Sequence, residues 1–369
     1  MVTPNEQLLN RSPLYESQKE LGARFGLSAG WEMPASYDDH LSEHLAVRAG
    51  VGLIDLSHYG AIKVWGSEAV QFLNGLVTNN VKELAPGKGM RAAFLTGHGK
   101  VKALCRILRL ESEYLIVNDP QTHKAVFDYV FPFSYAGDFK VEDASELYRL
   151  LSVQGPKSHL LMKEISFEPV PLLAEHEHFN TLVAGHRVMM AGANHTGEQG
   201  FDIFAPADAL KDVWDFILLK GQFHSIVPVG LEALDSLRIE AGIPVYGTDV
   251  DESNMMLETG LQDAVSFNKG CYTGQEAVAM ATYRGHVSKR LSGLAIKGEL
   301  VPERGDLIKK DGKEIGFIAS ALKSPTLGSV IALAYVKYGF FEPGNSLEIQ
   351  TGSQTLSALV VEFPFLRTA

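Results

Sequence analysis

Residues 196–201 have the sequence Thr-Gly-Glu-Gln-Gly-Phe and close a polar turn between two strand-like runs, 181–190 and 201–204. Glycines adopt backbone conformations with positive φ and let a ligand approach the main chain closely. Glu198 stands between the two glycines of this turn. A carboxylate can accept two parallel hydrogen bonds from an N–H and a neighbouring NH₂ group, and such a pairing is strong and directional. The turn is therefore a candidate binding site, and a solvated turn glutamate is the alternative interpretation.

The chain around this turn carries both helical and strand-like patterns up to about residue 287. Apolar residues recur at helical spacing in six segments: 14–26, 40–49, 69–76, 121–132, 207–219 and 230–241. Further strand-like runs are 60–65, two or three strands within 91–118, and 150–153. Ser67 is positioned to cap the helix that follows it, because a serine oxygen can accept a hydrogen bond from the first helical turn. This mixture predicts an α+β fold.

The last eighty residues have a different character. Strand-like runs recur there at short intervals, at 291–296, 306–309, 314–321, 329–336, 346–350 and 355–362. Turn sequences such as Asp311-Gly312 separate them, and helical periodicity is absent. This pattern predicts a small all-β domain, a barrel or a sandwich. We therefore expect one module over 1–287 and a β-barrel domain over 288–369.

A second motif, residues 269–276, reads Lys-Gly-Cys-Tyr-Thr-Gly-Gln-Glu. A cation near a thiol favours the thiolate, which is the reactive form of cysteine. The motif therefore predicts an exposed loop in which Lys269 activates Cys271, and we name both as candidate catalytic residues. A turn with an incidental cysteine is the alternative. The other specified positions of the motif are Gly270, Tyr272, Gly274, Gln275 and Glu276.

Composition excludes several classes of protein. The 369 residues are 46% hydrophobic and 21% charged, which is typical of a globular protein, and the net charge of −11 argues against a general nucleic-acid binder. The first residues form no signal peptide, and the longest apolar runs are too short to span a membrane. We expect a cytoplasmic protein that has no membrane partner.

The two cysteines, Cys105 and Cys271, are too few for a disulfide framework, a four-cysteine zinc site or a cubane cluster held by one chain. Cys105 falls within a strand, where a buried and inert thiol is expected. The histidines at positions 40, 44 and 58 are interpreted as surface or core residues, because no acidic third ligand accompanies them. No metal site is predicted.

Most of the chain resembles the aminomethyltransferase (glycine-cleavage T-protein) superfamily. The matching segments are 30–34 (Gly-Trp-Glu-Met-Pro), 43–48 (Glu-His-Leu-Ala-Val-Arg), 52–58 (Gly-Leu-Ile-Asp-Leu-Ser-His), 76–79 (Leu-Val-Thr-Asn), 154–156 (Gln-Gly-Pro), 196–201 and 237–242 (Leu-Arg-Ile-Glu-Ala-Gly). The resemblance implies a ring of two interleaved α/β subdomains plus a C-terminal β-barrel, with tetrahydrofolate or a derivative in the central hole.

The resemblance also implies folate-binding residues. The superfamily carries its pterin-binding carboxylate at the position of Glu198. Asn118, after a strand, is a second candidate. Arg238 is a third, because a guanidinium could meet the carboxylates of the ligand; a structural salt bridge is the alternative for this arginine.

The motif at 269–276 resembles the signature of the YgfZ/Iba57 family, whose members bind folate and assist iron–sulfur cluster assembly or repair. Two departures from the aminomethyltransferases agree with this. Those enzymes carry an acidic pair where this chain has Ala103 and Leu104, and commonly an arginine where it has Leu234. The missing carboxylate orients or activates the folate nitrogen during one-carbon transfer.

Three functions are therefore compared. The first is a folate-binding accessory protein that acts on iron–sulfur assembly or client proteins through Cys271. The alternative is a tetrahydrofolate-dependent aminomethyltransferase or methyltransferase, which the segment 196–201 favours and residues 103 and 104 oppose. The third is an RNA-modification factor, which rests only on a basic patch at 283–290 and is opposed by the net negative charge.

Overall fold

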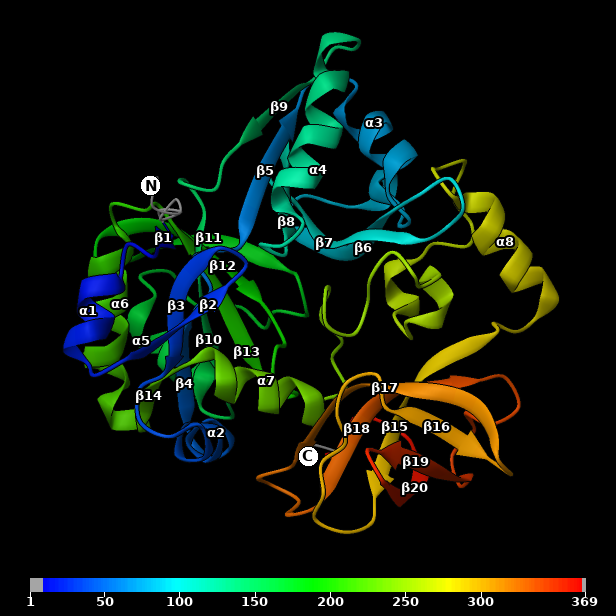
Figure 1. The fold of residues 1–369 in the computed structure, drawn as a ribbon. Coiled ribbons are helices and arrows are strands. Elements are labelled where there is room, and N and C mark those ends of the chain that lie inside the picture. The colour runs from blue at the N-terminus through cyan, green and yellow to red at the C-terminus, as the bar shows by residue number, and fades with distance from the viewer. Residues whose placement is uncertain (1–8, 367–369) are drawn as a thin grey trace, which may run out of the picture.

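The computed structural model describes residues 9–366, which form three lobes around a common centre (Figure 1). Two lobes are built on β-sheets that are covered by helices, and the third is a β-barrel formed by the C-terminal residues. This is the expected mixed fold. Among the helices of the described residues, none combines the length and the apolar character that crossing a bilayer requires.

The first lobe contains a six-stranded sheet with the order β11-β12-β13-β10-β4-β14. Its strands are β4 (Val51–Asp55), β10 (Arg149–Gln154), β11 (His178–Val183), β12 (His186–Gly192), β13 (Gly200–Ala205) and β14 (Ile226–Val229). Helices α5 (Ser158–Ile165) and α6 (Leu210–Gly221) bury apolar residues such as Trp214 against one face. Helices α2 (His40–Ala49) and α7 (Leu231–Glu240) pack against the other face through Val47 and Leu237.

The second lobe contains a five-stranded antiparallel sheet with the order β6-β7-β8-β5-β9. Its strands are β5 (Gly60–Trp65), β6 (Lys88–Leu95), β7 (Val101–Arg109), β8 (Glu113–Asn118) and β9 (Lys140–Asp143). Helices α3 (Ala69–Leu76) and α4 (His123–Val130) cover one face and enclose a core with Ala103 and Cys105. The chain enters this sheet after β4 and returns to the first sheet at β10, so the two lobes are interleaved as expected.

The C-terminal strands close into a six-stranded barrel with the order β15-β18-β17-β16-β19-β20. The strands are β15 (Lys289–Ile296), β16 (Leu307–Lys310), β17 (Lys313–Lys323), β18 (Val330–Lys337), β19 (Ser346–Thr351) and β20 (Gln354–Val361). Alternate residues fill the interior, as in β18, where Val330, Ala332 and Ala334 are buried in one core. The prediction of a small β-barrel is confirmed.

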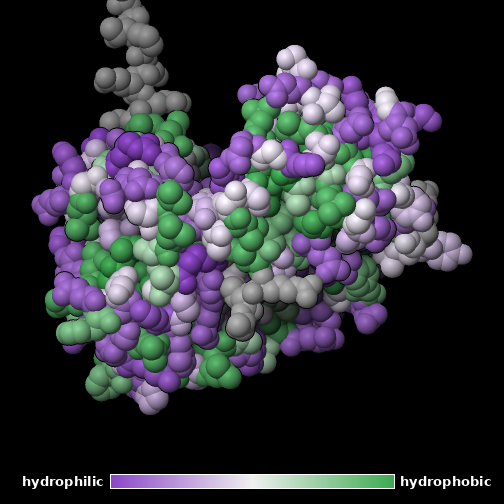
Figure 2. All heavy atoms as spheres, turned by 90° about the horizontal axis from the view of Figure 1, so that it is seen from below, coloured by the Kyte–Doolittle hydropathy of each residue, from purple (hydrophilic) through white to green (hydrophobic). Residues whose placement is uncertain are grey.

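Smaller elements complete the fold. Strands β1 (Asn10–Arg11), β2 (Arg24–Ser28) and β3 (Trp31–Ser36) form a three-stranded sheet beside α1 (Tyr15–Glu20). Helix α8 (Gln275–Arg284) precedes the barrel. Figure 2 shows hydrophilic and hydrophobic side chains interspersed over one face of the molecule.

Three local predictions need correction. The helix expected over 14–26 ends at Glu20, because Gly22 adopts φ +85° and the chain then turns into β2. The run 181–190 is a hairpin rather than one strand, because Ala184 and Gly185 both have positive φ and reverse the chain. Ser67 does not cap α3; its hydroxyl donates to a carboxylate oxygen of Asp138.

Candidate functional site

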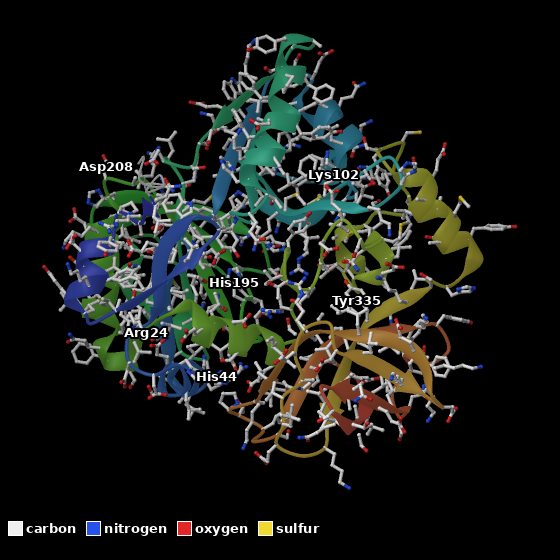
Figure 3. The ribbon with its side chains drawn as sticks, viewed as in Figure 1. Arg24, His44, Lys102, His195, Asp208 and Tyr335 are labelled. Carbon is white, nitrogen blue, oxygen red and sulfur yellow. The ribbon has the colours of Figure 1, made fainter. Side chains whose placement is uncertain are left out.

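A cavity lies between the two sheets, at the end of β8, beside β7 and below the turn that precedes β13. The segment 243–246, which follows α7, closes it. His195, which lines the cavity, lies on the inner side of the first lobe and faces the centre of the molecule (Figure 3). The charged and polar residues of the lining are Tyr59, Arg91, Arg106, Asn118, Asp119, Glu175, His176, Asn194, His195 and Tyr246.

Three buried nitrogen atoms of the lining have no hydrogen-bond partner among the described residues: Nδ2 of Asn118, Nη2 of Arg106 and Nδ1 of His176. An unsatisfied buried polar group costs roughly 1–3 kcal/mol. Native proteins rarely leave such groups unpaired unless they serve a ligand or an ordered water. Burial lowers the pKa of His176 to about 3, so its ring is neutral. The cavity therefore presents donors suited to a ligand that carries carbonyl oxygens and ring nitrogens.

An ion pair across the cavity wall holds the two sheets together. Asp202 of β13 is fully buried, accepts a hydrogen bond from Nε2 of His195 at 2.9 Å, and is paired with Arg106 of β7. Burial alone would raise the pKa of Asp202, but the His195 ring and the Arg106 guanidinium outweigh it and hold that pKa below its usual range. The pairing fixes the orientation of Arg106 and His195 in the cavity wall.

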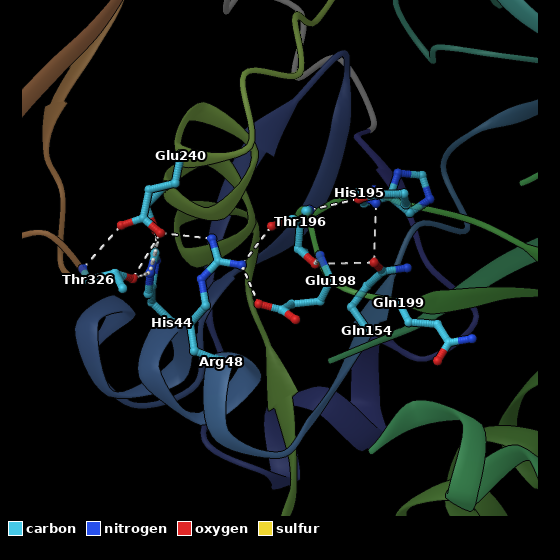
Figure 4. A network of polar contacts seen from close by, with 12 residues as sticks. His44, Arg48, Gln154, His195, Thr196, Glu198, Gln199, Glu240 and Thr326 are labelled. Atoms are coloured by element: carbon cyan, nitrogen blue, oxygen red, sulfur yellow. Dashed lines mark hydrogen bonds and ion pairs between the residues drawn. The ribbon is translucent and has the colours of Figure 1, made fainter. Parts of the chain in front are cut away.

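Glu198 lies outside this lining, in a chain of polar contacts between α2 and the barrel (Figure 4). Nη1 of Arg48 donates to Oε1 of Glu198 at 3.0 Å and to the carbonyl oxygen of Thr196 at 2.8 Å. Nη2 of Arg48 donates to Oε2 of Glu240 at 2.8 Å. The carboxylate of Glu198 is thus oriented by an arginine that also binds a buried glutamate of α7.

The other two folate candidates have different surroundings. Asn118 ends β8 and lines the cavity. Arg238 is buried and does not line the cavity: it pairs with Asp235 at 2.7 Å and with Asp249, and donates to the carbonyl oxygen of Ile243. Its guanidinium is occupied by partners within the protein, so the structure supports the structural salt bridge over ligand binding.

The motif at 269–276 is separate from the cavity. Cys271 is exposed, whereas Cys105 is buried and burial raises the pKa of its thiol. Lys269 is buried, and its ammonium donates to the carbonyl oxygens of Asn74, Val77 and Asn79 at 2.7–2.8 Å. Its three donors are used at the C-terminal end of α3, so the expected pairing of Lys269 with the thiolate of Cys271 is not formed.

The other residues of the motif at 269–276 mainly contribute to the local fold. Tyr272 is buried and its ring centre lies 4.8 Å from the Lys269 nitrogen. Gly274 has φ +83°, and a Cβ there would stand 2.5 Å from the carbonyl oxygen of Thr96, so only glycine fits. Gln275 and Glu276 begin α8. Around Gly270 there is open space.

The two non-acidic positions of β7 are not equivalent. Ala103 is buried in the core beneath α3 and α4, whereas Leu104 lines the cavity. Of the two residues where aminomethyltransferases carry an acidic pair, position 104 is therefore the one that lines the cavity. Arg106, His176 and His195 were not predicted from the sequence, because their approach to one another depends on the packing of two sheets. The available signal was the adjacency of His195 to the segment 196–201.

Comparison with known proteins places the chain in a family. A model described as "GCVT N-terminal domain" matches residues 14–269, and one described as "Glycine cleavage T-protein C-terminal barrel domain" matches residues 289–366. A protein of Halothermothrix orenii named "Aminomethyltransferase" is 33% identical over 97% of this chain and 100% of its own length. One of Bacillus subtilis with the same name is 29% identical over 98% of this chain and 100% of its own length.

A solved structure agrees with these sequence matches. The crystal structure of the glycine cleavage system aminomethyltransferase T from Bartonella henselae aligns with a TM-score of 0.89 at 26% identity. The alignment covers 97% of this chain and 98% of that one. The narrower resemblance to the YgfZ/Iba57 family stays a prediction, since the relatives named here are aminomethyltransferases. The chain belongs to the aminomethyltransferase family, whose fold is that of the glycine cleavage T-protein.

Proposed function

We propose that this protein binds tetrahydrofolate in the cavity between its two sheets and transfers a one-carbon unit to it from an aminomethyl donor. The relatives named above supply the reaction class, and the unpaired amide nitrogen of Asn118 in the cavity is the observation that carries the proposal. From the sequence alone, an iron–sulfur accessory role was the first hypothesis and the transferase was the alternative; this proposal puts the transferase first.

The cavity residues fit a pterin. A pterin presents a carbonyl oxygen and ring nitrogens that accept hydrogen bonds, and these would satisfy the buried donors of Asn118 and Arg106. Tyr59 and Tyr246 supply aromatic surface in the same lining. When bound, tetrahydrofolate supplies the nitrogen that accepts the carbon. Glu198, held by Arg48, is proposed to accept hydrogen bonds from the NH and NH₂ groups of the ring.

Calorimetry with tetrahydrofolate tests the binding. Asn118→Leu and Glu198→Ala should each weaken binding by roughly 1.5–3 kcal/mol, the range for a hydrogen bond that involves a charged or buried polar group. Asn180→Leu is the control, because Asn180 is exposed on β11, away from the cavity. If the Asn118→Leu and Glu198→Ala proteins both bind as tightly as the unmodified protein, the site is misplaced; if no reduced folate binds, the proposal fails.

A second candidate, an accessory role in iron–sulfur cluster assembly or repair, is favoured by one observation: the exposed thiol of Cys271 lies outside the cavity within the motif 269–276. In a deletion strain whose iron–sulfur enzymes lose activity, Cys271→Ala should then fail to restore them at matched protein levels. Thr273→Ala, a change at the one unspecified position of the motif, should restore them. Full rescue by Cys271→Ala would remove this candidate.

A further inference from the structure

We infer that Asp119 is the acid–base residue of the cavity and supplies the carboxyl group that position 104 lacks. This inference rests on the proposed transferase function. The acidic pair of the aminomethyltransferases is absent from β7, where Leu104 faces the cavity. Asp119 lines the same cavity from the end of β8, the strand that pairs with β7.

The pairing of the two strands places Asp119 beside the missing carboxylate. Strands β7 and β8 are antiparallel, and the last residue pair of their register joins Cys105 to Asn118. Continuing the register by one residue puts Leu104 opposite Asp119. Residues directly opposite in an antiparallel pair have Cβ atoms roughly 4.5–5.5 Å apart on one face of the sheet. A carboxyl group at 119 can therefore reach the space that a carboxyl group at 104 would reach.

The backbone holds Asp119 in place. Its Oδ1 accepts a hydrogen bond from the backbone N–H of Gln121 at 2.9 Å, and its carbonyl oxygen accepts from the backbone N–H groups of Thr122 and His123 at 3.0 Å. These contacts form the turn into α4 and use one carboxyl oxygen. Asparagine keeps such a turn, because its amide oxygen accepts the same bond. A change to asparagine therefore removes the acid–base function without removing the turn.

The surroundings suit proton exchange near neutral pH. Burial raises the pKa of Asp119 to about 6, and the bond from Gln121 opposes this only in part. Burial also raises the pKa values of Tyr59 and Tyr246, so both stay protonated. The other charged or titratable residues of the lining are Arg91, Cys105 and Arg106 of the second sheet and Glu175, His176 and His195 of the loops. Asp202 of β13 is buried and paired with Arg106 and His195.

The proposed proton transfer balances. The donor carbon forms two bonds to folate nitrogens, and each nitrogen releases one proton as its bond forms. Two bonds of the donor break: the amine leaves with one bonding electron pair, takes one proton and departs as ammonia, and the remainder of the donor leaves with the other pair and takes the second proton. The Asp119 carboxylate takes the first proton and gives it to the leaving amine, so no oxidant or further reactant is required.

Two measurements on the full-length protein test this role. Asp119→Asn should lower kcat by about 100- to 10,000-fold, the usual contribution of a general acid–base group, and leave the Kd for tetrahydrofolate within about threefold. Adding Leu104→Asp to that variant should recover at least about tenfold of the loss, because the carboxyl group returns on the neighbouring strand. Asp251→Asn, another turn aspartate whose Oδ1 accepts a backbone N–H, is the matched control.

Calorimetry in buffers of different ionisation enthalpy gives the readout that does not depend on turnover. Tetrahydrofolate binding by the unmodified protein should exchange a proton with a midpoint near pH 6, and Asp119→Asn should abolish this exchange. Unchanged kcat or unchanged proton exchange in Asp119→Asn would overturn the inference. If the unmodified protein binds folate but turns over no donor, the transferase proposal fails. The proton exchange then still tests Asp119: its loss in Asp119→Asn identifies Asp119 as the titrating group that faces the ligand, and its persistence excludes Asp119.

Discussion

Replacing Glu240 with alanine should lower the free energy of unfolding by about 3–5 kcal/mol, the usual result of removing one partner from a buried ion pair. The Glu240 carboxylate is fully buried and accepts hydrogen bonds from Arg48 at 2.8 Å and from the hydroxyl of Thr326 at 2.9 Å. His44 lies 3.1 Å from it and Ser324 donates to its other oxygen. The variant would leave Arg48 and several hydroxyl groups without this partner at the junction of α2, α7 and the barrel.

The loss of stability caused by Glu240→Ala should depend on pH. Burial alone would raise the pKa of Glu240, but the hydrogen bonds from His44, Ser324 and Arg48 outweigh it and lower that pKa from 4.5 to about 2. A carboxyl group with a lowered pKa in the folded state contributes stability above its unfolded-state pKa and loses it as the pH falls through the folded-state value. The difference between the unmodified protein and Glu240→Ala should therefore be full above pH 5 and shrink between pH 4.5 and pH 2.

Urea denaturation followed by circular dichroism measures this difference at each pH. Glu232→Ala is the matched control, because Glu232 lies on the same helix and its ion pair with Arg24 is exposed to solvent. That control should change stability by much less, since solvent screens exposed pairs. A Glu240→Ala protein as stable as the control at pH 7 would show that the network is not a stabilising junction.

Replacing Lys269 with methionine should lower the free energy of unfolding by about 2–4 kcal/mol, because carbonyl oxygens at the end of α3 lose their donor. Burial lowers the pKa of Lys269 to about 8, which is still above neutrality, so the ammonium keeps its three donors at pH 7. Methionine retains most of the length of the apolar stem but loses the ammonium, whose nitrogen lies 4.8 Å from the centre of the Tyr272 ring. The measured loss therefore reports the hydrogen bonds together with this contact of the ammonium with the ring. Lys82→Met, at an exposed lysine nearby, is the control.

The Lys269→Met variant also distinguishes two roles for Lys269: donating hydrogen bonds to backbone carbonyls and activating the thiol of Cys271. Alkylation of Cys271 near neutral pH should stay within about twofold of the unmodified rate, because a donor bound to backbone carbonyls does not stabilise the thiolate. Cys105 should remain unreactive in both proteins, since it is buried. If alkylation of Cys271 slows tenfold or more while the variant stays folded, Lys269 does activate the Cys271 thiol, as the sequence predicted.

Local patterns in the sequence were enough to predict most of the secondary structure. Alternation of apolar residues predicted the strands of the barrel, and helical spacing predicted α2, α3 and α7. A strand or helix that buries one face repeats its apolar residues with a fixed period, which is visible over a few residues. The segment 196–201 and the other segments that match the superfamily indicated the family. The errors arose where single residues with positive φ reversed the chain, as at Gly22 and at Ala184-Gly185. Residue types alone do not specify those angles.

The sequence by itself thus determined the class of most elements, the barrel, the aminomethyltransferase family and the burial of Cys105. Only the tertiary structure decided which side chains share the cavity. Arg106 meets Asp202 because the chain leaves the first sheet after β4 and returns at β10, and Asp119 and Leu104 each lie one residue beyond the last pair, Cys105 and Asn118, of the register between β7 and β8. Lys269 likewise meets α3 residues about 190 positions earlier. Such contacts depend on how distant segments pack, which no local period encodes.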